Sequence, residues 1–409
     1  MLKHLKSLFF TISLNTSVVF FSIYSILGKD YTSLSEDSSF LIFIILSTII
    51  SFTYVILDFI RNGSKTRQIH LFFYLLPIII LFIYLLESPV TDIGKRGLTL
   101  YLPFSVPFIY LGVNVALNQL LKSMIRWFDL IWIITTLGIF FSLGKVLNLE
   151  GSSIGGASYQ SLSYMAAYAF SLNLFFLFFG NRFNRFKFTR NKLFRIFSYF
   201  ALFIQISGVF FSGGRGGSIL LLISIIVLSY IRLKNGVSFA KFSFLTLIFS
   251  ALFFFIPRFM PSDIQFFISR GGSRIFKYFT SSGINMSETG RNLIFLESEK
   301  LINSKPIFGH GLFKYIDISG AHPHNIFLEF LLQGGILYLI FWIIVLILFL
   351  IKFYNSLKID IHNLFIIPIA IYPFTMLMFS GTYLHTGLFW FTITYVFSYK
   401  KSFNNNKVS

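Results

Sequence analysis

Seven consecutive residues, Ser-Gly-Gly-Arg-Gly-Gly-Ser at 212–218, are the first candidates for chemistry in this chain of 409 residues. The four glycines interrupt a helix and leave backbone N–H groups free, and successive free N–H groups form concave sites for anions. Arg215 adds a planar guanidinium that pairs with phosphate through two hydrogen bonds. The pattern predicts a phosphate-binding turn. The alternative is a tight interhelical turn whose arginine reaches the lipid headgroups.

A second candidate is Ala-His-Pro-His-Asn at residues 321–325, which precedes a long apolar run. Proline near the first helical position is a helix start signal, so His324 is expected at a helix N-terminus. The positive end of the helix disfavours imidazolium and keeps His324 neutral, as a base must be. A neutral histidine suits removal of a hydroxyl proton, and a helix-capping histidine is the alternative. Gly334 and Gly335 inside the run predict close helix packing or a kink.

Eight further basic residues lie in one long connection, residues 257–325. Connections of this length are usually functional or disordered, and the apolar stretch at 293–296 predicts that this one is ordered and partly helical. Its basic residues form either a solvated face or a set of ligands for an anionic substrate. They are Arg258, Arg270, Arg274, Lys277, Arg291, Lys300, Lys305 and Lys314.

The elements that position these candidates are predicted to be membrane-spanning helices. Hydrophobic residues make up 55% of the chain and charged residues 12%, which excludes both an ordinary soluble domain and a disordered chain. A spanning helix needs about 20 apolar residues, and these runs are too long for barrel strands. The predicted fold is all-α: one integral-membrane domain over residues 1–409, with the long loop between spans nine and ten. The twelve runs lie near 8–28, 39–60, 69–86, 98–118, 127–146, 161–180, 194–211, 216–232, 238–256, 326–351, 363–380 and 385–399.

The net charge of +19 would suggest nucleic acid if the protein were soluble. Here 21 of the 34 basic residues lie at the termini and in every second connection, against five in the other short connections. By the positive-inside rule, both termini are cytoplasmic and the long loop faces outward. No nucleic-acid partner is therefore expected. The chain has no cysteine, which excludes disulfides and thiolate metal sites.

Together these candidates resemble the bacterial O-antigen polymerase/ligase family of integral-membrane glycosyltransferases. The turn at 212–217 is similar to that family's Ser-x-x-Arg-Gly motif after an apolar span. Gly290-Arg291, followed by Pro-Ile-Phe-Gly-His-Gly at 306–311, is similar to the family's long-loop pattern. The aromatic residue usual a few positions after the loop arginine appears here only as Phe295, which is a minor departure.

The histidine segment carries the third part of the resemblance. His324-Asn325, nine residues, Gly335, two residues and Tyr338 are similar to the ligase signature. The resemblance covers roughly residues 205–340, and the twelve-span plan with one long loop extends it. All three motifs occur in order on the face predicted to be outer, which makes the set far more specific than any one of them.

The resemblance implies transfer of saccharides from undecaprenyl diphosphate to an acceptor hydroxyl. The reaction would take place at the periplasmic face of the bacterial inner (cytoplasmic) membrane, without a metal or other cofactor. Carried over by position, Arg215 and Arg291 would bind the diphosphate and stabilise its developing charge, and His324 would activate the acceptor. The expected partners are the lipid-linked oligosaccharide, membrane lipids and a chain-length regulator. Further candidates for substrate contact are Arg270, Arg274, His322 and Asn325.

Three alternatives stay open at this point. The divergent Phe/Ile-rich sequence favours a polymerase of O-antigen or capsule repeat units, and the His-Asn signature favours a ligase that moves the finished glycan to lipid A-core. A flippase or transporter would need polar residues along a path inside the spans, whereas the charges Asp58, Asp129 and Glu329 lie at span ends. A metal-dependent glycosyltransferase could use the acidic residues at 30–37, but their spacing forms no clear ligand set.

Overall fold

The computed structural model describes residues 2–32, 37–62, 68–147, 153–234 and 291–400. The regular structure of the described residues is helical, as the sequence predicts, apart from one isolated β-bridge. Contacts within the chain separate two compact units. Unit 1 comprises Met1–Leu14, Ile45–Lys122 and Met286–Ser409, and unit 2 comprises Asn15–Ile44 and Ser123–Asn285. The single membrane domain expected over residues 1–409 stays a prediction.

Eight helical stretches in the described part of the chain are long and apolar enough to cross a membrane. The count becomes nine if the interrupted pair α1 (Leu2–Leu14) and α2 (Thr16–Ile26) is one span. The eight are α3 (Ser39–Asn62), α4 (Gln68–Glu87), the pair α5 (Asp92–Phe104) and α6 (Val106–Leu117), α7 (Leu121–Leu147), α8 (Tyr159–Phe179), α9 (Lys192–Ser212), α10 (Arg215–Lys234) and α15 (Ile326–Ile359).

The remaining apolar runs do not all form full-length spans. The last two form the short helices α16 (Ile366–Leu377) and α17 (Gly387–Ser398), because a stretch with the 3-10 turn Tyr383–His385 interrupts the chain between them. A run of apolar residues predicts that a segment is buried in lipid or protein, but it does not predict how long the helix is. The ninth expected span, 238–256, lies outside the described residues. A count of twelve spans therefore stays a prediction.

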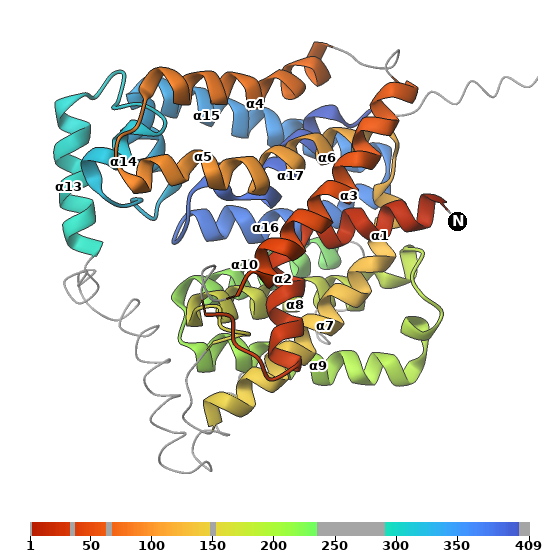
Figure 1. The fold of residues 1–409 in the computed structure, drawn as a ribbon. Helices are drawn as coiled ribbons and strands as arrows, with labels where there is room; N and C mark the ends of the chain where they lie inside the picture. Colours follow the sequence, from red (N-terminus) through yellow and green to blue (C-terminus); the bar gives the residue numbers. More distant parts are fainter. Residues whose placement is uncertain (1, 33–36, 63–67, 148–152, 235–290, 401–409) are drawn as a thin grey trace, which may run out of the picture. The chain divides into compact units, whose positions relative to one another are not determined.

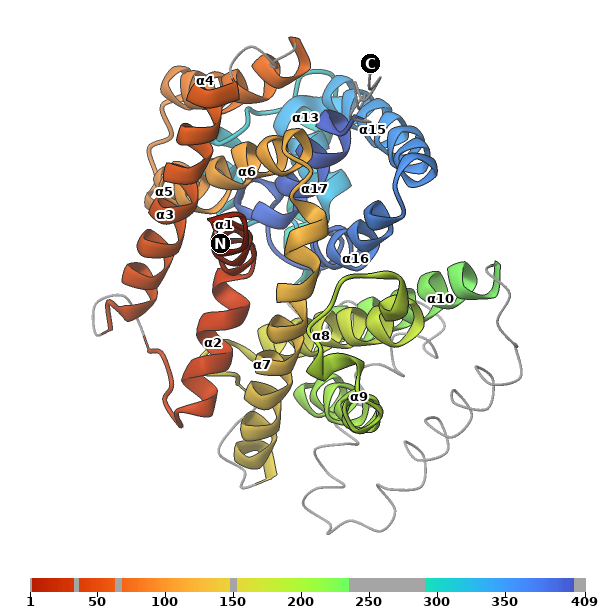
Figure 2. The same cartoon turned by 90° about the vertical axis from the view of Figure 1, so that its right-hand side faces the viewer.

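Unit 1 is built around α17, a helix that is apolar on all sides. This helix packs along α6 and also contacts α4, α15 and α16 (Figures 1 and 2). The helices α6 and α17 approach closely at Gly112, where a Cβ would lie 2.7 Å from the backbone carbonyl oxygen of Phe391. A helix that is hydrophobic all round is stable only when it is buried, and nearly every residue of α17 is buried.

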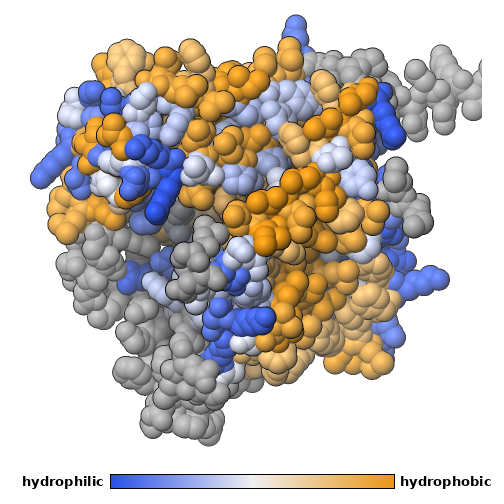
Figure 3. All heavy atoms as spheres, viewed as in Figure 1, coloured by the Kyte–Doolittle hydropathy of each residue, from blue (hydrophilic) through white to orange (hydrophobic). Residues whose placement is uncertain are grey.

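The outer faces of α3, α4 and α15 in unit 1 are apolar. Figure 3 shows apolar side chains over α3 and α4, with hydrophilic side chains around α13 (Arg291–Ser304). Exposed apolar residues on these helices include Ile49, Ile60, Ile78, Phe82, Ile344 and Leu350. A contiguous apolar face of this size is expected where a helix meets lipid.

Unit 2 is organised around α8, which lies against α9 and α10 and is almost completely buried. Polar side chains inside these spans form hydrogen bonds between helices. Gln205 donates to Thr136 Oγ1 at 2.6 Å, and Asn173 donates to Gln205 Oε1 at 3.3 Å. Such bonds hold neighbouring spans together in lipid, so these residues are packing contacts, as the sequence predicts.

Candidate functional site

The arginine turn of unit 2 joins α9 to α10 through only two residues. The helix α9 ends at Ser212, and Gly213 caps it in the left-handed conformation with φ +71°. The helix α10 begins at Arg215, which is partly buried. Arg215 thus lies on the first turn of a helix, where free N–H groups and the helix dipole favour an anion.

The other glycines of the turn are required by packing against α8. A Cβ on Gly216 would lie 1.9 Å from the hydroxyl of Tyr164, and one on Gly217 would lie 2.1 Å from Ser163 Oγ. The Ser163 hydroxyl also donates to the carbonyl of Gly214 at 2.8 Å. The close interhelical turn weighed as the alternative for this sequence is therefore present, and it places Arg215 at the start of α10.

In unit 1, α15 breaks at the glycine pair, which confirms the predicted kink. Gly334 has φ −136° and ψ 18°, and Gly335 has φ 63° and ψ −158°, so neither residue is helical. The break releases two carbonyl groups and one N–H group from the regular helical pattern. Gly335 is needed there for a second reason, since a Cβ would lie 2.3 Å from the carbonyl oxygen of Ile307.

The residues Pro306–Gly311, here called the strap, satisfy the groups that the break releases. Three backbone hydrogen bonds of 2.8 Å join the two segments: His310 N–H to Leu332 O, Gly311 N–H to Gln333 O and Ile336 N–H to Pro306 O. The long-loop motif and the glycines of the histidine motif are thus bonded to each other through backbone. We call this contact between the strap and the α15 break the joint. Upstream of the strap, α13 confirms the helix expected around residues 293–296.

Two carboxylates attach the strap and the short helix α14 (Lys314–Ser319) to the connection between α4 and α5. Glu87 accepts the backbone N–H groups of Leu312 and Phe313, both at 2.6 Å, and that of Lys314 at 3.1 Å. Asp317 accepts the N–H groups of Val90 at 2.8 Å and Thr91 at 3.1 Å, together with the Thr91 hydroxyl. Each carboxylate accepts backbone N–H groups at the entry to a helix, Glu87 at α14 and Asp317 at α5.

The histidine segment enters α15 differently from the prediction. The helix begins at Ile326, and Asn325 is its cap: Oδ1 accepts the N–H groups of Phe327 at 2.9 Å and Leu328 at 3.2 Å. Pro323 therefore lies outside the helix instead of near its first position, because the asparagine side chain satisfies the helix start better than a proline can. His324 directly precedes the cap, in the left-handed region with φ +55°.

A buried carboxylate one turn into α15 gathers the polar side chains nearby. Glu329 Oε1 accepts the hydroxyl of Tyr315 at 3.1 Å, the amide of Gln333 at 3.3 Å and the hydroxyl of Thr382. The Tyr315 hydroxyl also lies 2.8 Å from Nδ1 of His322. We call Glu329, Tyr315, Gln333, Thr382 and His322 the Glu329 network. It joins α14, α15 and the turn before α17.

Burial decides the charge state of the histidine in this network. Burial, with the nearby His385 and His324, lowers the pKa of His322 to about 4, so the imidazole is neutral at neutral pH. Burial and the Glu329 carboxylate raise the pKa of the Tyr315 hydroxyl well above its usual value, so Tyr315 stays protonated. The ring of His385 meets that of His322 edge to face, with centroids 6.0 Å apart. Its Nε2 lies 3.0 Å from the carbonyl oxygen of Gly97.

Residues 200–343 match the family described as O-antigen ligase, and this segment contains the arginine turn, the strap and the α15 break. The matched segment is a domain of the O-antigen ligase/polymerase family. The protein is a multi-pass membrane protein, and the family of this domain transfers glycans in lipopolysaccharide synthesis from lipid-linked substrates. No curated protein and no solved structure matches the chain.

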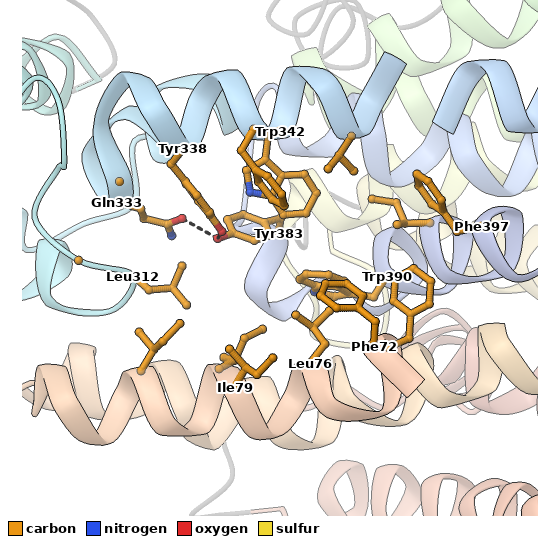
Figure 4. A pocket seen from close by; sticks show the side chains of 18 of the residues that line it. Phe72, Leu76, Ile79, Leu312, Gln333, Tyr338, Trp342, Tyr383, Trp390 and Phe397 are labelled. Atoms are coloured by element: carbon orange, nitrogen blue, oxygen red, sulfur yellow. Dashed lines mark hydrogen bonds between the residues drawn. The ribbon is translucent and has the colours of Figure 1, made fainter. Parts of the chain in front are cut away.

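An apolar cavity of about 540 Å³ adjoins the Glu329 network in unit 1 (Figure 4). Side chains of α4 form one wall, and those of α15 and α17 form the other. At one end, Tyr383 donates to Gln333 Oε1 at 2.6 Å and pairs with the Tyr338 hydroxyl at 2.9 Å. An apolar cavity with one polar end suits a hydrocarbon chain that carries a polar head. Its apolar lining includes Phe72, Leu76, Ile79, Leu312, Trp342 and Trp390.

The residues expected to act are placed as follows. Arg215 belongs to unit 2, whereas Arg291 and His324 belong to unit 1. Arg291 is the first residue of α13, and its side chain is outside the described part of the structure. Arg270 and Arg274 also lie outside the described residues. Within unit 1, His322 and Asn325 flank His324 as near neighbours in sequence.

Sequence reasoning missed Tyr315, Thr382 and His385, and it treated Glu329 as a span-end charge. One signal was present, because an acidic residue inside a long apolar run is costly unless it has partners. Those partners come from distant segments of the sequence. Among the residues that the structure describes, no three His, Cys, Asp or Glu side chains are grouped as metal ligands.

Proposed function

We propose that the protein polymerises lipid-linked oligosaccharide repeat units of O-antigen or capsule type. The glycan chain moves from undecaprenyl diphosphate to a sugar hydroxyl at the periplasmic face of the bacterial inner membrane. The observation that carries the proposal is the family match over residues 200–343, which includes Arg215, Arg291 and His324 in order. The divergent Phe/Ile-rich sequence favours a polymerase. The ligase that moves the glycan to lipid A-core is the second candidate, because the matching family is described as O-antigen ligase.

The proposed reaction is a substitution at the anomeric carbon of the donor. The acceptor oxygen forms a bond to that carbon, and the bond to the diphosphate oxygen breaks with its electron pair on the diphosphate. His324 takes the acceptor proton, and Arg215 and Arg291 stabilise the charge that develops on the leaving group. Attack from the face opposite the diphosphate inverts the anomeric centre. No step requires a metal in this scheme.

Four further residues are proposed to contact the substrate. Arg270 and Arg274 add positive charge for the diphosphate or for an acidic sugar. His322 and Asn325 lie on either side of His324, where the acceptor would bind. Because Asn325 uses its carboxamide oxygen to cap α15, its amide nitrogen is the group that it offers to a sugar.

The cavity in unit 1 supports a donor carried on lipid. Its walls come from α4 and α15, which are long enough to cross a membrane, and its polar end adjoins the strap and the Glu329 network. An isoprenoid chain would bury apolar surface there and leave its diphosphate at the polar end. The interhelical hydrogen bonds of Gln205 and Asn173 weigh against a flippase, because they use polar groups that a translocation path would need.

The test of the proposed chemistry is single substitution of its three main residues. Arg215→Ala, Arg291→Ala and His324→Ala should each lower release of undecaprenyl diphosphate from a purified lipid-linked donor by about 100-fold or more. The matched control is Arg96→Ala, which removes an exposed arginine of α5 and should leave the rate unchanged. A variant that expresses normally and keeps full activity removes its residue from the mechanism. Loss of activity with EDTA contradicts a metal-free reaction.

Deletion of the gene separates the two activities. Single repeat units on the core indicate a polymerase, and a bare core indicates a ligase. Unchanged surface polysaccharide contradicts both. Cytoplasmic termini, a periplasmic site and association with a chain-length regulator are part of the proposal, and accessibility of terminal tags to reagents added outside spheroplasts tests the orientation.

A further inference from the structure

The Glu329 carboxyl group has no role in the proposed reaction, although an ionisable group buried in a span is costly unless it has partners. Only 1% of Glu329 is exposed, and Oε1 accepts hydrogen bonds from Tyr315, Gln333 and Thr382. An oxygen that accepts three hydrogen bonds carries no proton of its own in this arrangement, whether or not Oε2 is protonated. Oε1 thus sets the directions of the hydrogen bonds around it.

These directions extend to His322 through Tyr315. The Tyr315 hydroxyl has one proton, and it donates that proton to Glu329 at 3.1 Å. The 2.8 Å contact between this hydroxyl and His322 Nδ1 must then be donated by the histidine. His322 is neutral, so a proton on Nδ1 leaves Nε2 unprotonated and able only to accept.

His322 is also reachable from outside the network. Its side chain is 23% exposed, although Nδ1 faces the fully buried Tyr315. The exposed part of the ring therefore lies away from Tyr315. The titratable groups that face His322 are Tyr315 from α14, Glu329 from α15, His385 from the turn before α17 and His324 from its own segment.

We propose that His322 binds the acceptor sugar: its Nε2 accepts a hydrogen bond from a sugar hydroxyl, and Tyr315 and Glu329 position it for that contact. The proposal rests on the proposed function and deepens it, because it assigns His322 to the acceptor and not to the donor. The chemistry of Nε2 supports this choice. An unprotonated nitrogen attracts a hydroxyl, which brings a proton, and it repels a diphosphate, which brings only acceptor oxygens.

The experiment measures the KM for the acceptor and for the donor separately, with release of undecaprenyl diphosphate as the readout. His322→Ala should raise the acceptor KM roughly 3- to 10-fold, the effect of one neutral hydrogen bond, and leave the donor KM unchanged. His322→Gln keeps an acceptor oxygen near the position of Nε2 and should recover part of the loss. Tyr315→Phe should raise the acceptor KM as well, because Nδ1 loses its acceptor and the other tautomer becomes populated.

A matched control separates this effect from general loss of packing. Tyr395→Phe removes another buried tyrosine hydroxyl of unit 1, one that donates to Asn363 at 2.5 Å, and it should change neither KM. The pH dependence gives a second readout. The acceptor KM of the unmodified protein should stay constant from about pH 7 to about pH 5 and rise toward pH 4, where protonation turns Nε2 into a donor.

The outcomes separate this inference from the proposed function. If His322→Ala and Tyr315→Phe keep the normal acceptor KM while His324→Ala is inactive, the assignment of His322 is wrong and the proposed function stands. A change in the donor KM alone also contradicts the assignment. If Arg215→Ala and His324→Ala are fully active as well, the proposed function itself is wrong.

Discussion

Gly335→Ala, which adds one methyl group, should disrupt the joint between the strap and the α15 break. At Gly335, φ 63° and ψ −158° define a conformation that other residues adopt only at a cost of about 1–3 kcal/mol. Alanine would also stabilise a continuous α15 by about 1 kcal/mol relative to glycine. Gly335→Ala should therefore shift the balance toward an unbroken helix and a detached strap by about 2–4 kcal/mol, before the overlap with the Ile307 carbonyl is added.

Hydrogen–deuterium exchange measures this shift directly. The amide N–H groups of His310, Gly311 and Ile336 close the joint in the native structure and should exchange slowly. A shift of about 2–4 kcal/mol corresponds to roughly 30- to 700-fold faster exchange at these three amides. Amides in the middle of α17, which is buried, should exchange at their normal rate.

The matched control is Gly28→Ala. Gly28 has a similar φ of +69°, and no atom lies within 4 Å of its Cβ position. This variant should carry part of the backbone strain without affecting the joint. Exchange at His310 and Gly311 within about threefold of the unmodified protein in Gly335→Ala would refute the reasoning. An equal acceleration in Gly28→Ala would also refute it, because the effect would then be general.

Three further predictions test the surroundings of the site. Glu87→Gln removes a charged acceptor from three backbone N–H groups and should lower the stability by about 2–4 kcal/mol in chemical unfolding, whereas Glu299→Gln on the exposed face of α13 should not. Gly216→Ala overlaps a tyrosine of α8 and should destabilise unit 2 by about 1–3 kcal/mol, whereas Gly144→Ala, inside α7 with open space around its Cβ, should stabilise it by up to about 1 kcal/mol in thermal unfolding. Burial lowers the pKa of His322 to about 4 from an unfolded value near 6.5, so stability should fall as pH drops through this range, and His322→Gln should weaken that dependence of the unfolding temperature.

The helical membrane architecture could be predicted because it depends on composition and on runs of local sequence. Apolar runs predict most of the observed spans, and the glycine pair predicts the break in α15. Helix ends were predicted less well. The run near 385–399 forms only the short α17, and Asn325, not Pro323, determines where α15 begins. In both cases the deciding contact is a turn or a cap, which hydropathy does not report.

The Glu329 network could not be predicted, because its members come from separate parts of the chain. Tyr315 and Thr382 are distant from Glu329 in sequence, and each is an ordinary residue in its local context. Only Glu329 itself carries a signal, as a charge in an apolar run. Position in sequence shows that such a charge needs partners, but only the fold shows which side chains supply them.

The glycines of the two motifs have the same physical role in each unit. Gly216 lets α10 approach α8 and so positions Arg215 at the start of α10. Gly335 lets α15 break against the strap and so positions the segment that contains His324. The consequences of substitution differ. The strap follows the helix that begins at Arg291, and the break follows His324 by little more than two turns, so a change at Gly335 disturbs the segments on both sides of the joint. A change at Gly216 should act on Arg215 alone. Activity lost through Gly335→Ala should therefore affect donor and acceptor together, whereas loss through Gly216→Ala should appear only in the donor.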